Sequence, residues 1–422
     1  MCNNPIENFI VSLLNIIPNR LQSSVSAYLL ALMLDVSKRT LTNAASVAGK
    51  HKSQFSRLLS DHADLALASL MLLGLDAAKL ASKGRGPLVS GVPWNIAIII
   101  DATLHPRSSL HVHNAQRFNH GSGFVIGHQW TNIAIFVNGM FIPLPPIPFF
   151  SKNECKRRGV MYQTEHERIA EYLEDLKLSQ YVGFHDPKEV VVLADSGYDN
   201  KKLQRLIISL GWDFLSSLKT SRGAQTSNEA KTSPKSWRRI DALFRAVKKQ
   251  APWKTVHIKV DQGKKRKKFR ARKLIGRIKD VPHDVALICS EKSSGVGRRY
   301  FACSNTEIDV GAILRVYRIR WEVEMFHRAV KHQLGMLDAG VTDFDALTAH
   351  IHWVYSAWLL LHRVKIPGAK SLFEKQRALQ SMVARTPVVA AIKKITTART
   401  QCGGIKRQKK LVQEALQGAM VA

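Results

Sequence analysis

The sequence predicts an α/β protein whose core is a sheet of the ribonuclease-H kind, and two observations support this. Helical spacing of apolar residues gives way after about residue 90 to short β-branched runs, and residues 94–100 and 189–194 have the composition of fully buried strands. Strands and helices then alternate, as expected for an α/β sheet. We expect an all-helical region before this ribonuclease-H-like core, a β-rich insertion within it and a helical tail after it.

The chain is long and strongly basic. Its 422 residues include 63 Lys and Arg against 32 Asp and Glu, a formal net charge of +31. This excess indicates a polyanionic partner, while a hydrophobic content of 45% excludes a largely disordered basic chain. The N-terminus lacks the basic start of a secretory signal, the five cysteines are scattered, and the apolar runs are too short to cross a bilayer. We therefore expect a cytoplasmic, nucleoid-associated protein that binds nucleic acid and no membrane.

Residues 1–85 are predicted to be a helical DNA-binding domain, because apolar residues recur there at helical spacing. Within residues 40–60, a small residue, a glycine and two apolar residues have the spacing of a helix-turn-helix. In such a motif the glycine makes the turn, and the apolar residues anchor the second helix. These residues are Ala45, Gly49, Phe55 and Leu58.

The start of the second helix in this motif would face a DNA groove. Lys50, Lys52 and Gln54 are the side chains that would contact DNA there. An ordinary helical hairpin has the same spacing, and such matches are common by chance. Both interpretations stay open at this level.

The first part of the core is expected to cover residues 90–225. Its strands and helices follow from β-branched runs, from an amphipathic acidic stretch and from a hairpin signal at Asn138-Gly139. In chain order we expect strands at 94–100, 132–139 and 140–145, a helix at 164–178, a strand at 189–194, a helix at 200–210 and a strand at 212–218.

The remainder of the chain divides by composition. A polar loop is expected at 221–235, and alternation over 237–303 predicts a basic β-rich insertion at 226–305. Core helices should resume over 306–365, including a buried one near 345–363, before a basic helical tail at 366–422 that carries clusters at Lys393-Lys394 and Lys406 to Lys410. The run Lys264 to Lys268 is a solvated turn or a DNA-backbone contact, and the basic composition favours the contact.

Two aspartates directly follow the predicted buried strands. Asp101 ends the first run and Asp195 ends the next, in V-V-L-A-D-S-G-Y. Ligands commonly bind where the strands of an open α/β sheet end, and two adjacent carboxylates repel each other unless a cation lies between them. Each aspartate could instead cap the helix that follows it.

A third carboxylate lies on a predicted helix at 317–331. Tyr317, Arg320, Glu324 and Lys331 fall within roughly 60° of one another at about 100° per residue, and an apolar face on the opposite side would present this stripe outward. Glu322 lies about 120–160° away from Glu324 around the helix, so we reject it.

Three carboxylates of this kind suit a pair of divalent cations. Asp101, Asp195 and Glu324 together can hold two Mg²⁺ or Mn²⁺ ions, one activating the attacking oxygen and one stabilising the leaving oxygen in phosphoryl transfer. Oxygen ligands without accompanying thiols favour these ions over zinc.

The sequence resembles DDE transposases of the IS-four family of bacterial insertion sequences. The family signature Y-x-x-R-x-x-x-E-x-x-x-x-x-x-K matches the four residues of the stripe without gaps, and the D-S-G-Y context at Asp195 is similar too. So is the long interval between Asp195 and Glu324, which the β-rich insertion occupies. The resemblance covers about residues 95–340.

The resemblance implies a reaction and a partner. Asp101, Asp195 and Glu324 would bind the metals, water would cut a phosphodiester at the transposon end, and the freed 3′-hydroxyl would attack target DNA. Tyr317, Arg320 and Lys331 would bind phosphates. A dimer or larger assembly would hold two double-stranded DNA ends in a cut-and-paste reaction.

Further DNA contacts are expected around the site. Lys219 and Arg222 follow a sheet strand and would contact phosphates. By similarity to such enzymes, an insertion aromatic, Trp237 or Trp253, would stack on a displaced base, with core packing as the alternative. The residues next to the stripe, Trp321 and His327, contact DNA or pack, and five histidines between 105 and 128 suggest a loop near DNA rather than a metal site.

Two other functions compete with a transposase. One is a non-catalytic regulator that binds DNA through the Ala45–Leu58 hairpin, and three intact carboxylates argue against it. The other is a ribonuclease-H-like DNA nuclease without strand transfer, and the basic insertion and tail favour binding of transposon ends over this alternative.

Overall fold

The structure is a computed structural model, and it describes most of the chain. The described residues are 13, 15–34, 38–121, 123–232, 236–247, 251–260, 265–293, 295, 297–363, 366, 368–369 and 371–385. The basic clusters predicted at Lys393-Lys394 and Lys406 to Lys410 lie outside these residues.

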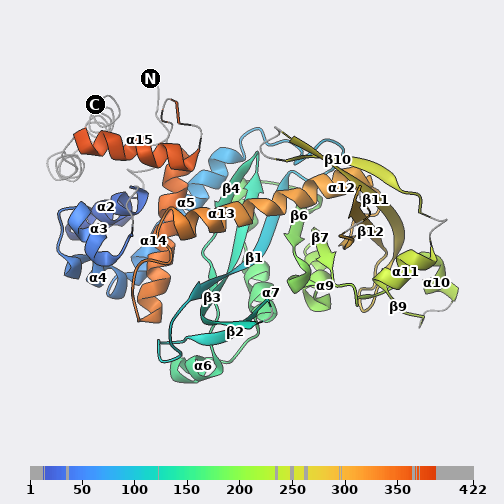
Figure 1. Cartoon of the computed structure of the whole chain (residues 1–422), viewed down its shortest axis with the longest axis horizontal. Coiled ribbons are helices and arrows are strands. Elements are labelled where there is room, and N and C mark those ends of the chain that lie inside the picture. Colours follow the sequence, from blue (N-terminus) through green and yellow to red (C-terminus); the bar gives the residue numbers. More distant parts are fainter. Residues whose placement is uncertain are drawn as a thin grey trace.

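One large mixed sheet runs through the described part of the molecule (Figure 1). Its strands come both from the predicted core and from the predicted insertion. They are β1 Ile96–Pro106, β2 Gln116–His120, β3 Gly123–Val137, β4 Met140–Pro143, β5 Ile147–Pro148, β6 Val190–Ala194, β7 Asp213–Leu218, β8 Gly223–Thr226, β9 Arg238–Arg239, β10 Lys254–Val260, β11 Lys265–Ile278, β12 Val285–Lys292 and β13 Arg299–Cys303.

The helices and 3₁₀ turns flank this sheet or form the N-terminal and C-terminal parts. The helices are α2 Asn19–Met33, α3 Leu41–Val47, α4 Lys52–Ser60, α5 Ala63–Ala81, α6 Lys152–Arg158, α7 Glu165–Asp175, α8 Leu178–Val182, α9 Lys201–Ser209, α10 Ser227–Thr232, α11 Ile240–Ala246, α12 Val310–Tyr317, α13 Trp321–His332, α14 Phe344–Arg363 and α15 Leu372–Arg385. The 3₁₀ turns are η1 Pro187–Glu189, η2 Ser196–Tyr198 and η3 Arg318–Arg320.

The strands of the predicted core occur in the order β4-β3-β1-β6-β7. β1 is antiparallel to β3 and parallel to β6, and β6 is parallel to β7. Asn138 and Gly139 make the predicted hairpin between β3 and β4 with φ values of 48° and 76°. This order and these directions are compatible with a ribonuclease-H-like core.

Local sequence signals explain the helices next to this core. Thr164 and Glu167 form a reciprocal capping box at the start of α7. The Asn200 side chain accepts backbone N–H bonds at the start of α9, so the capping role considered for Asp195 at this helix belongs to Asn200. Both helices agree with the predicted ranges to within three residues.

β1 is longer than the sequence predicts, which changes the setting of Asp101. The strand continues through Asp101 to Pro106, and only its pairing with β6 stops, at Ile100 opposite Ala194. Asp101 therefore lies within a strand and not after one. The cause is β3, which continues to pair with β1 beyond that point.

The insertion extends the core sheet. β13 pairs with β7, and β12 and β11 follow outward. The loop predicted at 221–235 is wrong in its described part, because β8 pairs with β11 and Thr226 and Glu229 cap α10 through reciprocal hydrogen bonds. The turn alternative for the run Lys264 to Lys268 is wrong for Lys265 to Lys268, which lie in β11 opposite β10; Lys264 is outside the described residues, and the favoured DNA-backbone contact remains a prediction.

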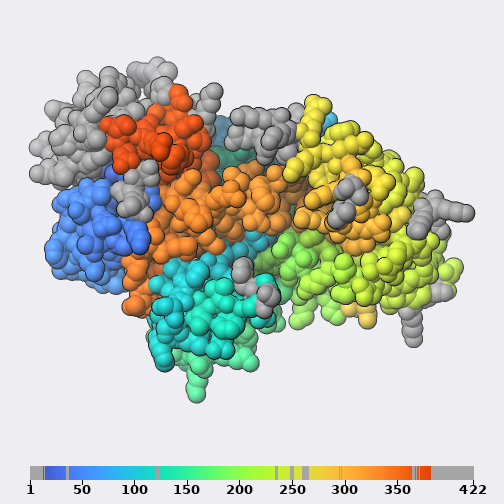
Figure 2. Space-filling model, viewed as in Figure 1, coloured from blue at the N-terminus to red at the C-terminus, as the bar shows by residue number. Residues whose placement is uncertain are grey.

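Helices lie at one end of the molecule, at the opposite end and between the two. Figure 1 shows α2, α3 and α4 beside α14 at one end and the insertion strands at the other. In Figure 2 the orange segment that includes α13 lies exposed between these ends. α14 is almost entirely buried, as predicted. No single helix among the described residues is long and apolar enough to cross a membrane; α4 and α5 reach that length only as a pair bent by 77°.

Candidate active site

The sheet register places Asp101 and Asp195 side by side. Ile100 is the register partner of Ala194 on the parallel strands β1 and β6, and each aspartate is the next residue. Neighbouring strands lie about 4.8 Å apart. Asp195 Oδ1 accepts a hydrogen bond from Gly197 N at 2.7 Å, so this side chain caps η2 and also borders the site.

Arg320 joins the third carboxylate to the first. Its Nη1 lies 3.6 Å from Asp101 Oδ2, and its Nη2 donates to Glu324 Oε1 at 3.2 Å. The Arg320 and Asp101 side chains are each only 15% exposed, whereas Glu324 is 41% exposed. The three predicted carboxylates thus share one neighbourhood, with an arginine between two of them.

The electrostatics of Asp101 reflect this crowding. Burial raises its pKa from 3.8 to about 7, and the nearby Asp195 and Glu324 raise it further, while Arg320 acts in the opposite direction. A carboxyl group with such a pKa favours an additional cation nearby. This is the electrostatic state expected where a metal or a general base operates.

The stripe of four residues is less exposed than the sequence predicts. The helix is interrupted by η3, and Arg320 is only 15% exposed and lies against Asp101. Tyr317 and Lys331 are half-buried, and the Glu324 side chain is 41% exposed. Tyr317 packs edge-on against Phe301 and hydrogen-bonds with Ser217, and burial raises the pKa of its hydroxyl. Burial also lowers the pKa of Lys331, although Asp101 and Glu324 oppose that shift.

His327, left open between DNA contact and packing, is buried against the site. Its Nδ1 lies 3.8 Å from Asp101 Oδ2, and its Nε2 is 2.8 Å from Asn132 Nδ2. The Tyr355 hydroxyl donates to Asn132 Oδ1 at 2.5 Å. Burial lowers the pKa of His327 to about 3, so its imidazole is neutral near pH 7.

Two further residues near the site, Glu165 and Tyr198, belong to no motif or periodic pattern in the sequence. The carboxylate of Glu165, at the start of α7, accepts hydrogen bonds from Thr131 at 2.6 Å and from Tyr198 at 2.9 Å. Burial and then Glu165, Asp101 and Asp195 raise the pKa of Tyr198. Only the fold brings α7 against η2, so no local pattern could have identified them.

The two basic residues beyond β7 have different surroundings. Lys219 is exposed and open to a phosphate. Arg222 is 17% exposed, lies 3.4 Å from Asp199 and donates to Gln204 at 3.2 Å. Its guanidinium therefore tethers β8 to η2 and α9, and a phosphate contact by Arg222 remains a prediction.

The tryptophans considered for base stacking are both partly buried. Trp253 packs against the core, with Arg272 and Arg270 over its ring at 4.7 and 5.3 Å from the centroid. Trp237 is half-buried beside β8. By contrast, Trp321 is 42% exposed with Arg318 over its ring.

The predicted helix-turn-helix residues form a pair of short helices, α3 and α4, around Gly49. Phe55 and Leu58 are buried, and Lys52 and Gln54 are exposed. Lys50 is partly buried and its Nζ donates to Ser23 at 2.8 Å. Two helices around a glycine fit both a helix-turn-helix and an ordinary hairpin, and DNA contact by these side chains remains a prediction.

The loop predicted around the histidines is wrong for His105 and His128. They are register partners on β1 and β3, almost fully buried, and their rings lie near Trp130. Burial lowers their pKa values to about 3 and about 4. They belong to the core and not to a DNA-facing loop.

An open pocket of about 280 Å³ adjoins the carboxylates. Asp195, Tyr317 and Arg320 line one side of it, and Arg299 and Ser217 line another. Arg320 Nη1 is buried without a hydrogen-bond partner. The pocket therefore has the arginine side chains of Arg299 and Arg320 among its lining residues together with Asp195, and such donors can bind a phosphate.

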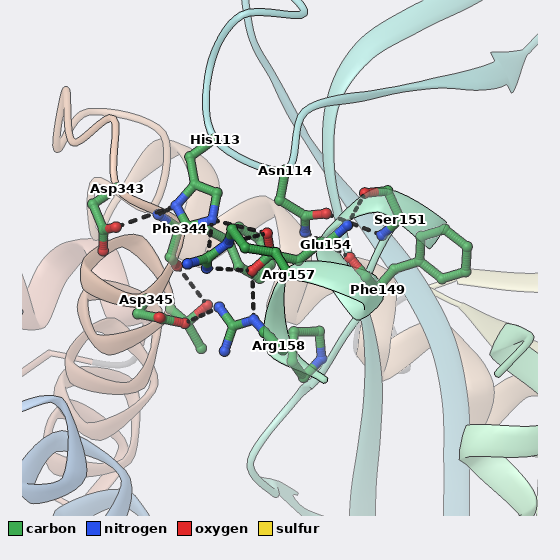
Figure 3. A network of polar contacts seen from close by, with 12 residues as sticks. His113, Asn114, Phe149, Ser151, Glu154, Arg157, Arg158, Asp343, Phe344 and Asp345 are labelled. Carbon is green, nitrogen blue, oxygen red and sulfur yellow. Dashed lines mark hydrogen bonds and ion pairs between the residues drawn. The ribbon is translucent and has the colours of Figure 1, made fainter. Parts of the chain in front are cut away.

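A second polar cluster surrounds Glu154, on α6, away from these residues (Figure 3). Its carboxylate, 4% exposed, accepts hydrogen bonds from Arg157 at 2.7 and 2.9 Å and also from Arg158, and it lies 3.1 Å from His113 Nε2. Arg158 also pairs with Asp345 at the start of α14. This cluster fastens α6 to α14.

The donor atoms of the site suit a divalent metal, but the carboxylates are not close enough together to surround one. Among the described residues, no three His, Cys, Asp or Glu side chains are grouped closely enough to hold a metal ion as they stand. The donors are carboxylate oxygens without thiols, and burial together with the neighbouring acids raises the pKa of Asp101, so a bound cation would stabilise its charged form. These residues fit Mg²⁺ or Mn²⁺, provided that Arg320 moves from between Asp101 and Glu324.

Comparison with known protein families gives one match. Residues 164–360 match a family model described as "Transposase DDE domain". The span is somewhat less than half of the chain; it contains Asp195, Glu324 and the whole stripe, and it begins after Asp101. No curated protein matches the chain. The match supports a DDE-type transposase, for which DNA is the partner and divalent metal ions are the usual cofactors.

Proposed function

We propose, on the premise of a DDE-type transposase, that this chain cleaves DNA at transposon ends and transfers the 3′-hydroxyl into target DNA. The observation that carries the proposal is the position of Arg320, in contact with both Asp101 and Glu324 beside Asp195. It supports one functional unit made of residues from β1, the end of β6 and α13.

Asp101, Asp195 and Glu324 would hold the metal ions. Two Mg²⁺ or Mn²⁺ ions bound there would supply activation of the attacking oxygen and stabilisation of the leaving oxygen. The burial of Asp101 keeps water from screening these charges, and Gly197 N fixes the orientation of Asp195.

The cations of the stripe would bind the DNA backbone. Arg320 lines the pocket, so its guanidinium would donate hydrogen bonds to a phosphate oxygen bound there. Tyr317 lines the same pocket, and Lys331 lies close enough to Asp101 and Glu324 to interact with both charges. These residues would position the scissile phosphodiester between the carboxylates and the pocket.

The finer assignment follows the IS-four family with its Y-R-E-K signature. We propose a cut-and-paste reaction in the bacterial cytoplasm at the nucleoid, with a homodimer that holds two inverted repeats. The helical domain at 1–85 would bind DNA through Lys50, Lys52 and Gln54. Lys219, Arg222 and an insertion tryptophan, Trp237 or Trp253, would add contacts to the ends.

The test is metal-dependent cleavage of a plasmid that carries the DNA flanking this reading frame. We expect the wild-type protein to cut it with Mg²⁺ or Mn²⁺, and Glu324→Gln to lose cleavage. Glu322→Gln is the matched control on the same helix, because Glu322 is exposed and off the stripe. Full cleavage by Glu324→Gln would contradict the assignment of the third carboxylate.

Strand transfer is tested in the same reaction with a second, target plasmid. A covalent joint between the 3′-hydroxyl of the end and target DNA is expected for a transposase. Cleavage without any joined product would instead favour the nuclease that lacks strand transfer.

A further inference from the structure

A chain of three buried polar side chains leads from the interior of α14 to Asp101. Tyr355 donates to Asn132 at 2.5 Å, Asn132 is 2.8 Å from His327 Nε2, and His327 Nδ1 lies 3.8 Å from Asp101 Oδ2. Tyr355, Asn132 and His327 are 0%, 1% and 7% exposed. They belong to α14, β3 and α13, so three separate elements meet behind one carboxylate.

The hydrogen bond of Tyr355 determines which groups are donors and which are acceptors along the rest of this chain. Within the described part of the chain, the structure gives the buried Tyr355 hydroxyl no acceptor other than Asn132 Oδ1, and a buried hydroxyl without an acceptor is destabilising. The amide oxygen of Asn132 is thereby committed to Tyr355. Its Nδ2 must donate to His327 Nε2, which therefore carries no proton.

The remaining ring nitrogen then has a defined role. A neutral imidazole has one protonated nitrogen, so Nδ1 bears the hydrogen and faces Asp101 Oδ2. Arg320 Nη1 approaches the same oxygen. Both donors thus approach Oδ2 of the Asp101 carboxylate.

The sheet register makes this arrangement rigid. Asn132 is the register partner of Asp101 on the antiparallel strands β3 and β1, so the two side chains share one face of the sheet. Phe326, next to His327, packs edge-on against Tyr355 at 4.7 Å between ring centroids. The helices α13 and α14 are therefore held together directly behind the chain of polar groups.

We propose that Asn132 and His327, anchored by Tyr355, are positioning residues that fix the orientation of the Asp101 carboxylate for a divalent cation. This inference rests on the proposed function. The groups do not touch DNA or a reacting atom; they act through Asp101. Partners behind a metal-binding side chain commonly affect metal affinity by about 10–100-fold.

A second network in the same helix provides a matched control. The Tyr28 hydroxyl lies 2.7 Å from His350 Nδ1, and His350 Nε2 lies 3.0 Å from the carbonyl oxygen of Gly335. Tyr28 and His350 are as buried as Tyr355 and Asn132. They join α2 to α14 and contact none of the three carboxylates, so Tyr28→Phe tests packing alone.

The tautomer of His327 is the first readout, and it does not depend on metal or DNA. ¹⁵N NMR of the full-length, histidine-labelled protein, with the His327 signals assigned from His327→Asn, should show protonated Nδ1 and unprotonated Nε2. Asn132→Asp should invert this, because a carboxylate accepts a proton from Nε2. Protonated Nε2 in the wild-type protein would overturn the proposal.

Affinity for Mn²⁺ alone, measured by calorimetry on the full chain, is the second readout. We expect Tyr355→Phe and His327→Leu to weaken Mn²⁺ binding about 10-fold or more. His327→Asn should restore much of the affinity, since its amide can place a donor where Nδ1 lies, and Tyr28→Phe should leave it unchanged.

The outcomes separate this inference from the proposed function. If Asp101→Asn weakens Mn²⁺ binding but Tyr355→Phe and His327→Leu do not, the positioning role is wrong and the metal site stands. If the wild-type protein binds no Mn²⁺, or Asp101→Asn binds it equally well, the proposed metal site fails and the inference with it. Equal weakening by Tyr28→Phe would show a packing effect and overturn the positioning role.

Discussion

Two buried carboxylates of this protein, Glu154 and Asp101, each lie beside an arginine and a histidine, yet their pKa values move in opposite directions. Hydrogen bonds from Arg157, and further ones from Arg158 and His113, lower the pKa of Glu154 to about 2. Burial raises the pKa of Asp101 to about 7. The difference lies in the completeness of the hydrogen bonding and in the neighbouring acids.

The distances explain the contrast. Arg157 is 2.7 Å from Glu154, whereas Arg320 and His327 remain 3.6 and 3.8 Å from Asp101. Glu154 has its full set of donors and stabilises the fold (Figure 3). Asp101 lacks them and faces other carboxylates, so its charge is stabilised only when a cation is added.

The largest expected effect is on catalysis. Asp101→Asn should reduce Mg²⁺-dependent end cleavage by at least about 10³-fold, about 4 kcal/mol, because it removes a metal-binding charge. Glu154→Gln should cleave within a few-fold of wild type, measured in the same plasmid assay at a temperature where both proteins are folded. A comparable loss in both variants would show that the two carboxylates do not differ in role.

The second prediction concerns stability, and here the Glu154 variant is the one expected to show a loss. Glu154→Gln should lower the free energy of unfolding by roughly 2–3 kcal/mol, because Arg157 and Arg158 lose their buried counter-charge. Urea unfolding followed by circular dichroism measures it. Glu171→Gln is the control on the neighbouring helix α7, where no comparable buried ion pair is removed.

The candidate carboxylates could be selected from the sequence because their signals are local. Asp101 and Asp195 follow β-branched runs, and Tyr317, Arg320, Glu324 and Lys331 recur at helical spacing. The structure brings these residues together. The stripe is less exposed than the sequence predicts, because Arg320 lies against Asp101 and is largely buried.

The residues that support the site could not be found in this way. Asn132 and Tyr355 are apart in sequence from each other and from His327, and they meet only through the β1–β3 register and the packing of α14. Arg222 is a basic residue just beyond a strand, which in the sequence suggests a DNA contact. Its ion pair with Asp199 depends on the position of β8 relative to η2 in the fold. Periodicity reports which face is buried and not which polar groups meet there.

The third prediction concerns pH in metal-free protein. The raised pKa of Asp101 destabilises the fold fully above pH 7; this penalty fades as the pH falls towards 3.8 and is absent below it. A rise from 3.8 to about 7 is equivalent to at most about 4 kcal/mol, and we expect Asp101→Asn to stabilise the protein by about 1–3 kcal/mol at pH 8. The gain should disappear by pH 4.

Glu154 should show the opposite dependence. Its lowered pKa contributes stability above pH 4.5, and this contribution is lost as the pH falls towards 2. Unfolding free energies of wild type, Asp101→Asn and Glu154→Gln in EDTA between pH 2.5 and 8 measure both trends. A gain for Asp101→Asn that grows towards acid pH would contradict the assigned direction.

The arginines of the two clusters provide the fourth prediction. Arg320→Ala should weaken DNA binding and reduce the salt dependence of the affinity by about one phosphate contact, because the Arg320 side chain lines the pocket beside Asp195. Arg158→Ala should leave that slope unchanged, since Arg158 is engaged by Glu154 and Asp345. Fluorescence anisotropy at several salt concentrations, with EDTA present, compares the two slopes.

The smallest effect is expected at the rim of the Glu154 cluster. Asp345 pairs with Arg158 at 2.7 Å, but its side chain is 54% exposed, so water and salt screen the pair. Asp345→Asn should lower the free energy of unfolding by only about 0.5 kcal/mol at low salt and by less at high salt, as judged by urea unfolding at both ionic strengths. The loss caused by Glu154→Gln should hardly change with salt, because that carboxylate is 4% exposed. Similar salt dependence in both variants would mean that solvent reaches Glu154. The difference in pKa between Glu154 and Asp101 would then be explained by the acids next to Asp101 alone.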